Sequence, residues 1–331
     1  MTWLEALQQT PPLYHGFLAF AGAIAGSFAS AAIWRIPRDG MTIWKPARSH
    51  CPKCGALIRW HDNLPLLGWV VLGGRCRDCK VSFGPGYLIH EVVLAALFVL
   101  AGRSWAADPA AGGGPGALLF VLVALTALWI AAAIDWQHFI LPDSITIGGV
   151  GFGLLASALV PAFHLWPDLG GRAPWGIGWL GLDAASPPVQ QALASALLGA
   201  TISFCFLFGI GRLFSYLLGQ DALGFGDVKY LAAVGALLGL EGAVWTLLVG
   251  VFAGALFGIA NVSRMILAVR RRRHARGSGR AYAHSAAHVG WAVGRVIPFG
   301  PPLILGTTLL LLDPASVHRF FFETWPGLLI R

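Results

Sequence analysis

Long apolar stretches alternate with short polar segments along most of the chain. Several of these stretches approach or reach the roughly 20 residues that cross a bilayer as an α-helix. The pattern predicts eight transmembrane helices, at 13–34, 87–105, 116–134, 144–163, 189–210, 228–240, 242–262 and 289–312. A polar insert, 35–86, separates the first two helices. The predicted fold class is an all-α polytopic membrane protein with a small cytoplasmic insert.

Four parts follow from this pattern: residues 1–34 with the first transmembrane helix, the insert 35–86, a helical membrane domain 87–312, and a tail 313–331. The first helix carries small residues on one face, which lets it pack closely on another helix in lipid. These residues are Gly22, Gly26, Ser27, Ala29 and Ser30.

Two positions are expected to interrupt the apolar segments. Glu241 and Gly242 predict a tight turn between the sixth and seventh helices. The prolines of segment 298–302 predict a kink in the eighth.

Composition agrees with a membrane protein. Of 331 residues, 56% are hydrophobic and only 11% are charged, against about a quarter in soluble domains. The net charge of +8 would suit nucleic acid binding, but the cationic residues gather in two segments, 35–86 and 264–280. Such clusters mark cytoplasmic loops. We therefore exclude nucleic acid as a partner and place both segments in the cytoplasm and the N-terminus outside. Glu5 precedes the first apolar run, so no cleavable signal peptide is predicted.

Two aspartates fall at the same predicted depth. Asp135 closes the third helix and Asp227 opens the sixth, both at the cytoplasmic face. Two neighbouring carboxyl groups can share one proton, so that one activates water while the other donates to a carbonyl oxygen, as in aspartic proteases. Gly224 and Gly226 let the loop turn sharply into the helix at Asp227.

Simpler roles compete with this interpretation. Asp is a favoured N-cap residue, and capping explains Asp227 as well as catalysis does. For Asp143, which follows Pro142 at a predicted helix start, capping is the favoured interpretation.

Four of the five cysteines form two close pairs. They are Cys51, Cys54, Cys76 and Cys79, in the arrangement Cys-Pro-Lys-Cys and Cys-Arg-Asp-Cys. Thiolates at this spacing favour a structural zinc site over a redox site. Cys205, alone in an apolar helix, is expected to be a small apolar filler, and His50 and His61 to be surface residues.

Together these features resemble the bacterial type IV prepilin peptidase family over nearly the whole chain. The matching segments, in order, are Gly26-Ser27-Phe28, Arg35-Ile36-Pro37, the two cysteine pairs with Asp62-Asn63-Leu64-Pro65 between them, Tyr87 and Glu91, Ile134-Asp135, Leu141-Pro142-Asp143, Gly224-Phe225-Gly226-Asp227-Val228-Lys229, and Pro298-Phe299-Gly300-Pro301.

The resemblance implies a membrane aspartic endopeptidase of the bacterial inner membrane. Such enzymes remove a short basic leader from prepilins or pseudopilins at the cytoplasmic face. Many then methylate the new N-terminus with S-adenosylmethionine, which adds a second cofactor beside zinc. Asp135 and Asp227 match the catalytic pair, with Lys229 beside the second acid.

Two alternatives remain open from the sequence. Another membrane protease with a Gly-x-Gly-Asp acid would share Asp227, although the zinc insert favours the prepilin type. A non-enzymatic transporter or assembly scaffold could use intramembrane acids to carry protons. Transporters usually contain internal repeats, and none is evident here.

Overall fold

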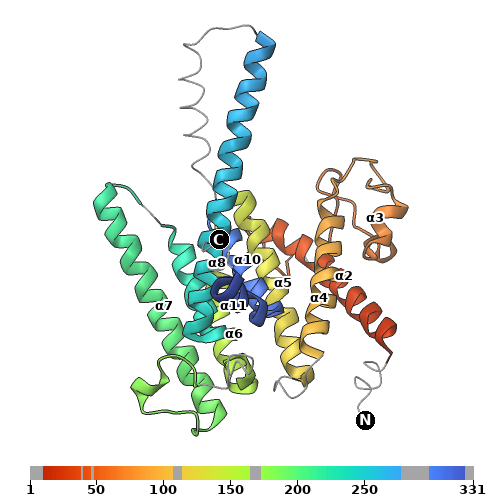
Figure 1. The fold of residues 1–331 in the computed structure, drawn as a ribbon. Coiled ribbons are helices and arrows are strands. Elements are labelled where there is room, and N and C mark those ends of the chain that lie inside the picture. Colours follow the sequence, from red (N-terminus) through yellow and green to blue (C-terminus); the bar gives the residue numbers. More distant parts are fainter. Residues whose placement is uncertain are drawn as a thin grey trace.

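The computed structural model describes residues 10–38, 40–45, 48–106, 114–164, 173–221, 223–276 and 298–324. Seven main helices build the membrane part: α2 (Pro11–Arg35), α4 (Gly86–Ala106), α5 (Gly114–His138), α6 (Asp143–Leu159), α7 (Pro188–Leu218), α8 (Phe225–Arg276) and α10 (Gly300–Leu312) (Figure 1). Short elements connect or follow them: η1 (Trp60–Asn63), α3 (Leu67–Val71), η3 (Pro161–Phe163), η5 (Ile177–Leu180), α11 (Pro314–Arg319) and η6 (Phe320–Thr324).

Helix α8 folds back on itself at Gly239. Gly239 has non-helical angles, φ 71° and ψ −177°, inside an otherwise helical run. The hydroxyl of Thr307 lies 2.6 Å from that of Tyr230 and 3.4 Å from that of Thr246. In one straight helix Tyr230 and Thr246 would stand about 24 Å apart. Tyr230 and Thr246 can both contact Thr307 because α8 is a hairpin. Its first limb is 225–238 and its second limb is 240–276.

The predicted fold class is confirmed. Five helices are long and apolar enough to cross a membrane, and α6 and α10 are shorter apolar helices. Because α8 has two limbs, eight apolar helical segments are present in the described part of the chain. The predicted turn at Glu241 and Gly242 lies slightly too far along the chain, because the left-handed backbone is at Gly239.

Two predicted boundaries are wrong. Helix α7 runs on to Leu218, and the predicted basic loop from 264 is helical as far as Arg276. Arginine is a good helix former, so a helix can continue beyond its apolar part. The rest of that loop, and residues 289–297 of the predicted eighth helix, lie outside the described residues. Pro298 precedes α10, and Pro301 and Pro302 lie in its first turn.

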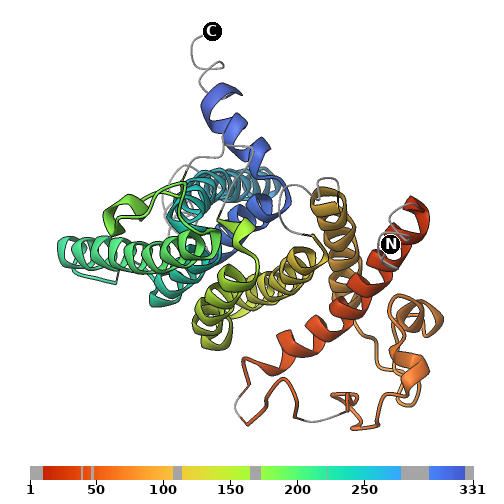
Figure 2. The same ribbon diagram turned by 90° about the horizontal axis from the view of Figure 1, so that it is seen from below.

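Close packing of α2 on α4 confirms the predicted small-residue face. A Cβ on Gly22 would meet the carbonyl oxygen of Leu94, and one on Gly26 would overlap the Cα of Glu91. Glycine at both positions therefore brings the two backbones together. A similar crossing joins α7 to the first limb of α8, where Gly199 and Gly235 lie against each other's backbone. Figure 2 shows these two groups of helices side by side, with α5 between them.

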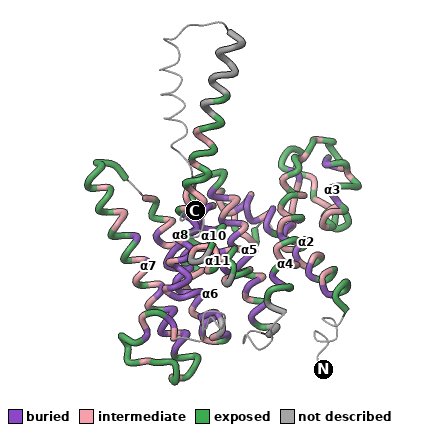
Figure 3. The backbone as a smooth tube through the Cα atoms, viewed as in Figure 1, coloured by how far each residue is buried: buried purple, intermediate pink, exposed green. Residues whose placement is uncertain are grey.

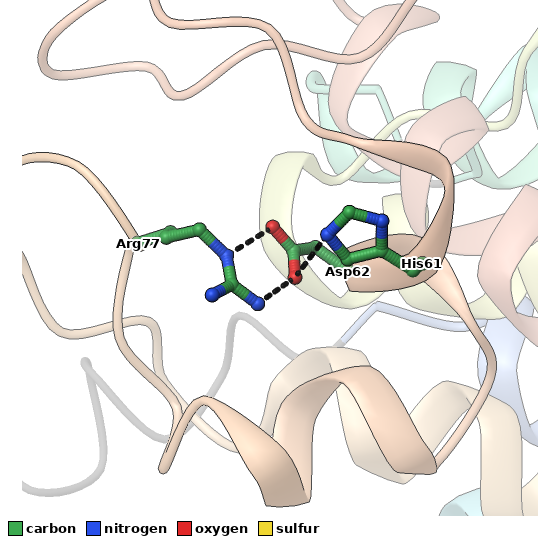
Figure 4. Close-up of polar contacts among 3 residues, drawn as sticks. All are labelled: His61, Asp62 and Arg77. Atoms are coloured by element: carbon green, nitrogen blue, oxygen red, sulfur yellow. Dashed lines mark hydrogen bonds and ion pairs between the residues drawn. The ribbon is translucent and has the colours of Figure 1, made fainter.

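The insert projects from the same side of the molecule as the far end of α8 (Figure 1). Most of its residues are exposed or half-buried, whereas the buried residues gather in the helices (Figure 3). An ion pair ties its two halves together. Arg77 Nε donates to Asp62 Oδ2 over 2.8 Å, and His61 Nε2 lies 3.6 Å from Asp62 Oδ1 (Figure 4). The hydrogen bond from Arg77 holds the pKa of Asp62 below its usual value.

Candidate active site

Asp135 lies in the last turn of α5 and is only 5% exposed. The helix stops three residues later, at His138. Phe139 then adopts a left-handed conformation with φ 57°, and its N–H donates to the carbonyl oxygen of Asp135 over 2.9 Å. A left-handed backbone at a bulky residue is uncommon and costs free energy, and such strain is frequent at functional sites.

The start of α10 contacts the Asp135 carboxyl group. The N–H of Gly300 donates to it. A Cβ at Gly300 would overlap Asp135 Oδ2 and lie 3.0 Å from its Cγ, so only glycine fits. Pro301 and Pro302 follow, and proline has no N–H. Gly300 therefore supplies the one backbone donor among these three residues.

Asp227 lies in the first turn of α8 and is half-buried. A Cβ on Gly224 would lie 3.2 Å from Asp227 Oδ2, so this glycine leaves room for the carboxylate. Asp227 is inside the helix and not at its N-cap, which argues against the capping interpretation. Its carboxyl group interacts electrostatically with that of Asp135. The fold thus places the two predicted acids close enough for their charges to interact.

Leu141 lies between the two halves of this site. It is 8% exposed. A Cβ on Gly226 would lie 3.2 Å from Leu141 Cβ, and a Cβ on Gly300 would lie 3.3 Å from Leu141 Cδ2. The same leucine therefore packs on the glycine beside each acid.

Asp143 does not cap α6. The N-cap residue is Pro142, in an extended conformation, and no side chain caps this helix. Asp143 instead forms an ion pair with Lys229 Nζ. The favoured capping interpretation was wrong because the partner of Asp143 comes from α8, far away in the sequence. This ion pair joins the segment after Asp135 to the helix that carries Asp227.

The four paired cysteines converge in the insert. All four sulfur atoms lie within 4.8 Å of one another, and Cys51 Sγ is 3.8 Å from Cys79 Sγ. Zinc–sulfur bonds of 2.3 Å in a tetrahedron place sulfur atoms about 3.8 Å apart. The cluster can therefore hold a metal ion. Neither predicted surface histidine belongs to it: His61 is largely exposed, while His50 is half-buried against Trp34.

Both cysteine pairs are built in the same way. The N–H of Gly55 donates to Cys51 O over 2.9 Å, and that of Lys80 donates to Cys76 O over 3.1 Å. Gly55 and Lys80 both have positive φ, 73° and 57°. A backbone hydrogen bond from Cys54 lowers the pKa of Cys51 to about 7, which favours the thiolate that binds metal. Cys205, expected to be a small apolar filler, is exposed.

Comparison with known proteins agrees with this architecture. A family model described as "Bacterial Peptidase A24 N-terminal domain" matches residues 20–105, and one described as "Type IV leader peptidase family" matches 120–259. A "Prepilin leader peptidase/N-methyltransferase" of Klebsiella pneumoniae is 37% identical over 74% of this chain and 93% of its own length. The chain belongs to the type IV leader peptidase family.

Other members of the type IV leader peptidase family match as well. A protein of the same name from Aeromonas salmonicida (strain A449) is 29% identical over 97% of this chain and 98% of its own. A "Type 4 prepilin-like proteins leader peptide-processing enzyme" from Escherichia coli O78:H11 is 30% identical over 71% and 81%. No solved structure matches the chain. Like its family, this protein is a peptidase.

Sequence reasoning did not assign Gly300 or Leu141 to the site. Gly300 lies beyond the segment matched by the leader peptidase model, which ends at 259. The sequence Gly-Pro-Pro at a helix start could have pointed to Gly300, because proline has no N–H and the glycine is then the single backbone donor of the three. The left-handed conformation of Phe139 was missed as well, because the local sequence does not signal it.

Proposed function

We propose that this protein is a membrane aspartic endopeptidase that removes the leader peptide of type IV prepilins or pseudopilins, with Asp135 and Asp227 as its catalytic pair. The observation that carries the proposal is the convergence of Asp135, Asp227 and the N–H of Gly300 at one place. Peptide hydrolysis needs a base to activate water and an acid to protonate the carbonyl oxygen, and two interacting carboxyl groups supply both.

The surroundings support different roles for the two acids. The Gly300 N–H and the positive end of α10 favour the ionised form of Asp135. We therefore assign Asp135 as the base that takes a proton from water. The negative charge of Asp135 favours the protonated form of Asp227. Asp227 therefore holds the shared proton and donates it to the scissile carbonyl oxygen. Collapse of the tetrahedral intermediate breaks the C–N bond, and the leaving nitrogen takes a proton to become the new N-terminus.

The charge pattern and the fold support a location of the site at the cytoplasmic face. The insert carries the excess of cationic residues that marks a cytoplasmic segment, and it projects from the side where α8 ends. Because α8 is a hairpin, its far end returns to the side of the molecule on which the helix begins, next to Asp227. We therefore assign both acids to that side. We place the site at the cytoplasmic face of a bacterial inner membrane. There a substrate's apolar helix can stay in lipid while its leader junction reaches the acids.

The direct test is cleavage of a purified prepilin, with a basic leader and an apolar helix, by Asp135→Asn and Asp227→Asn variants in detergent. Each variant should lose about 100-fold to 10,000-fold in rate. Asp221→Asn is the matched control, because Asp221 is an exposed acid in the loop before α8. Normal cleavage by either catalytic variant would eliminate the pair.

We also propose that the cysteine cluster holds structural zinc. The four sulfur atoms fit a closed tetrahedral site, and such a site supplies the folding free energy of a small domain. Removal of the metal with a strong chelator should unfold the insert, while Cys205→Ser should leave the metal content unchanged. Intact thiols with no metal by elemental analysis would refute the zinc site.

N-methylation of the new N-terminus is the second proposed activity. It is supported by the names of the relatives, which combine leader peptidase with N-methyltransferase. S-adenosylmethionine would supply the methyl group. Incubation of cleaved product with the radiolabelled donor tests it, and an unlabelled product would contradict it.

A further inference from the structure

A cavity of about 160 Å³ lies under the insert, between the insert and helices α2 and α4. Polar and aromatic groups line it together. Those used below are Ser27, Arg35, Trp69, Tyr87 and Glu91. The cavity is separate from Asp135 and Asp227, neither of which lines it. The peptidase chemistry described above makes no use of it.

Glu91 is the unusual group in this cavity. It is 7% exposed, and buried carboxylates are normally paired with a cation. One oxygen, Oε2, accepts the N–H of Leu66 over 2.7 Å, and the Ser27 hydroxyl also donates to the carboxylate. A carboxylate has about four acceptor positions, so part of its capacity is unused.

No cation pairs with Glu91 within the described part of the chain. Arg35 lines the same cavity, but its guanidinium donates to the carbonyl oxygen of Ile43 over 2.7 Å. Arg77, which also lines the cavity, is engaged by Asp62, and Arg75, the third arginine of the lining, forms no ion pair with Glu91. The cavity therefore combines a buried carboxylate with no cationic partner and aromatic walls, which suits a cationic ligand.

A contact between α4 and α5 relates the position of this carboxylate to that of the peptidase site. The indole N–H of Trp129 on α5 donates to Nδ1 of His90, the residue before Glu91. Trp129 precedes Asp135 by six residues, an axial distance of about 9 Å. Neighbouring helix axes are roughly 8–10 Å apart. A chain end released at Asp135 is thus within a few residues' reach of Glu91.

We propose that this cavity binds the α-ammonium group of the newly cleaved product, with Glu91 as its counter-ion and proton acceptor. The inference rests on the proposed function, because amide hydrolysis is what creates that ammonium group. A proton passes from the ammonium nitrogen to the Glu91 carboxylate, leaving a neutral amine and a carboxylic acid. The neutral amine is the form that an N-methylation requires.

The test compares two peptides that reproduce the apolar N-terminal helix of a mature pilin, one with a free N-terminus and one acetylated. Binding to the full-length protein in detergent is measured by thermophoresis. The free amine should bind at least about tenfold more tightly, because acetylation removes the charge-assisted hydrogen bond. Glu91→Gln, whose amide oxygen can still accept the Leu66 N–H, should abolish this preference. Equal binding of the two peptides by the wild-type protein would overturn the proposal, and this comparison holds even if Glu91→Gln fails to fold.

A second arm separates this inference from the peptidase assignment. Asp227→Asn should lose cleavage but keep the preference for the free amine. If Asp227→Asn cleaves normally while the amine preference is present, the proposed function fails and the cavity assignment stands. A photoreactive first residue on the free peptide should cross-link to Trp69 or Tyr87, and cross-links confined to other helices would contradict the cavity assignment.

Discussion

Two clusters of polar residues lie at opposite ends of the first limb of α8, and they differ in how completely their polar atoms are hydrogen-bonded. At one end are the two carboxyl groups and Gly300. At the other end a histidine cluster, Ser157, His164 and Ser195, lies against Gly239. His164 Nε2 is 2.7 Å from Ser157 Oγ, and Nδ1 is 3.1 Å from Ser195 Oγ. Ser157 also donates to the carbonyl oxygens of Gly153 and Ala236.

Every polar side-chain atom of the histidine cluster has a partner within it or on a nearby backbone. A proton on Nε2 satisfies all of them, with Ser157 accepting from Nε2 and Ser195 donating to Nδ1. The three residues are at most 2% exposed. Such a network fixes a structure and has no capacity left for a ligand. The two acids differ, because Asp227 is half-buried and, among the residues that the structure describes, the N–H of Gly300 is the single hydrogen-bond donor to the Asp135 carboxyl group. The acids keep unused hydrogen-bonding capacity, whereas the histidine cluster is fully hydrogen-bonded. This difference distinguishes a reactive site from a structural one.

The largest expected effect is the loss of prepilin cleavage in Gly300→Ala, which tests the reactive end of this comparison. The added methyl group would overlap Asp135 Oδ2 and force the carboxylate out of position. A misplacement of about 1 Å in a catalytic group can cost roughly 100-fold in rate, and we expect a loss of that size in prepilin cleavage. Gly148→Ala is the matched control, because a Cβ there meets nothing within 4 Å. Wild-type cleavage by Gly300→Ala would contradict the position assigned to Asp135.

Gly239→Ala should act on stability. A Cβ at Gly239 would overlap Ser195 Oγ and lie 3.1 Å from His164 Nδ1, and φ 71° strains any residue with a side chain. The strain alone predicts a loss of about 1–3 kcal/mol in the free energy of unfolding. Thermal unfolding in detergent measures it, with Gly151→Ala, in open space, as control. Equal stability of the two variants would show that the hairpin does not depend on glycine.

Over a single pH unit, the smallest change in stability is expected from the titration of His164. Burial lowers the pKa of His164 from 6.5 to about 4. Between these values the unfolded chain binds more protons than the folded chain, so stability falls as the pH decreases from 6.5 towards 4. The loss is at most about 1.4 kcal/mol per pH unit. His164→Gln should flatten this dependence, whereas His138→Gln, at an exposed position, should retain it. Identical pH profiles for wild type and His164→Gln would contradict the assignment of this histidine.

Much of the architecture could be predicted from the sequence. Hydropathy located the eight apolar segments, and cysteine spacing located the four-cysteine cluster, because both signals are local. Gly300 and His164 could not be placed in this way. Each matters through a residue distant in the chain, Asp135 for the first and Ser195 for the second. Asp143 was misjudged for the same reason, since its partner Lys229 comes from another helix.

The central claim is that Asp135 and Asp227 act as one unit, and a double variant tests it most directly. Cleavage rates are compared for Asp135→Asn, Asp227→Asn and the combined variant. If the two acids share one proton and one water, each single change already removes the mechanism, so the double variant should be no slower than the slower single variant. Losses that multiply in the double variant would show that the two acids act independently and would contradict the account.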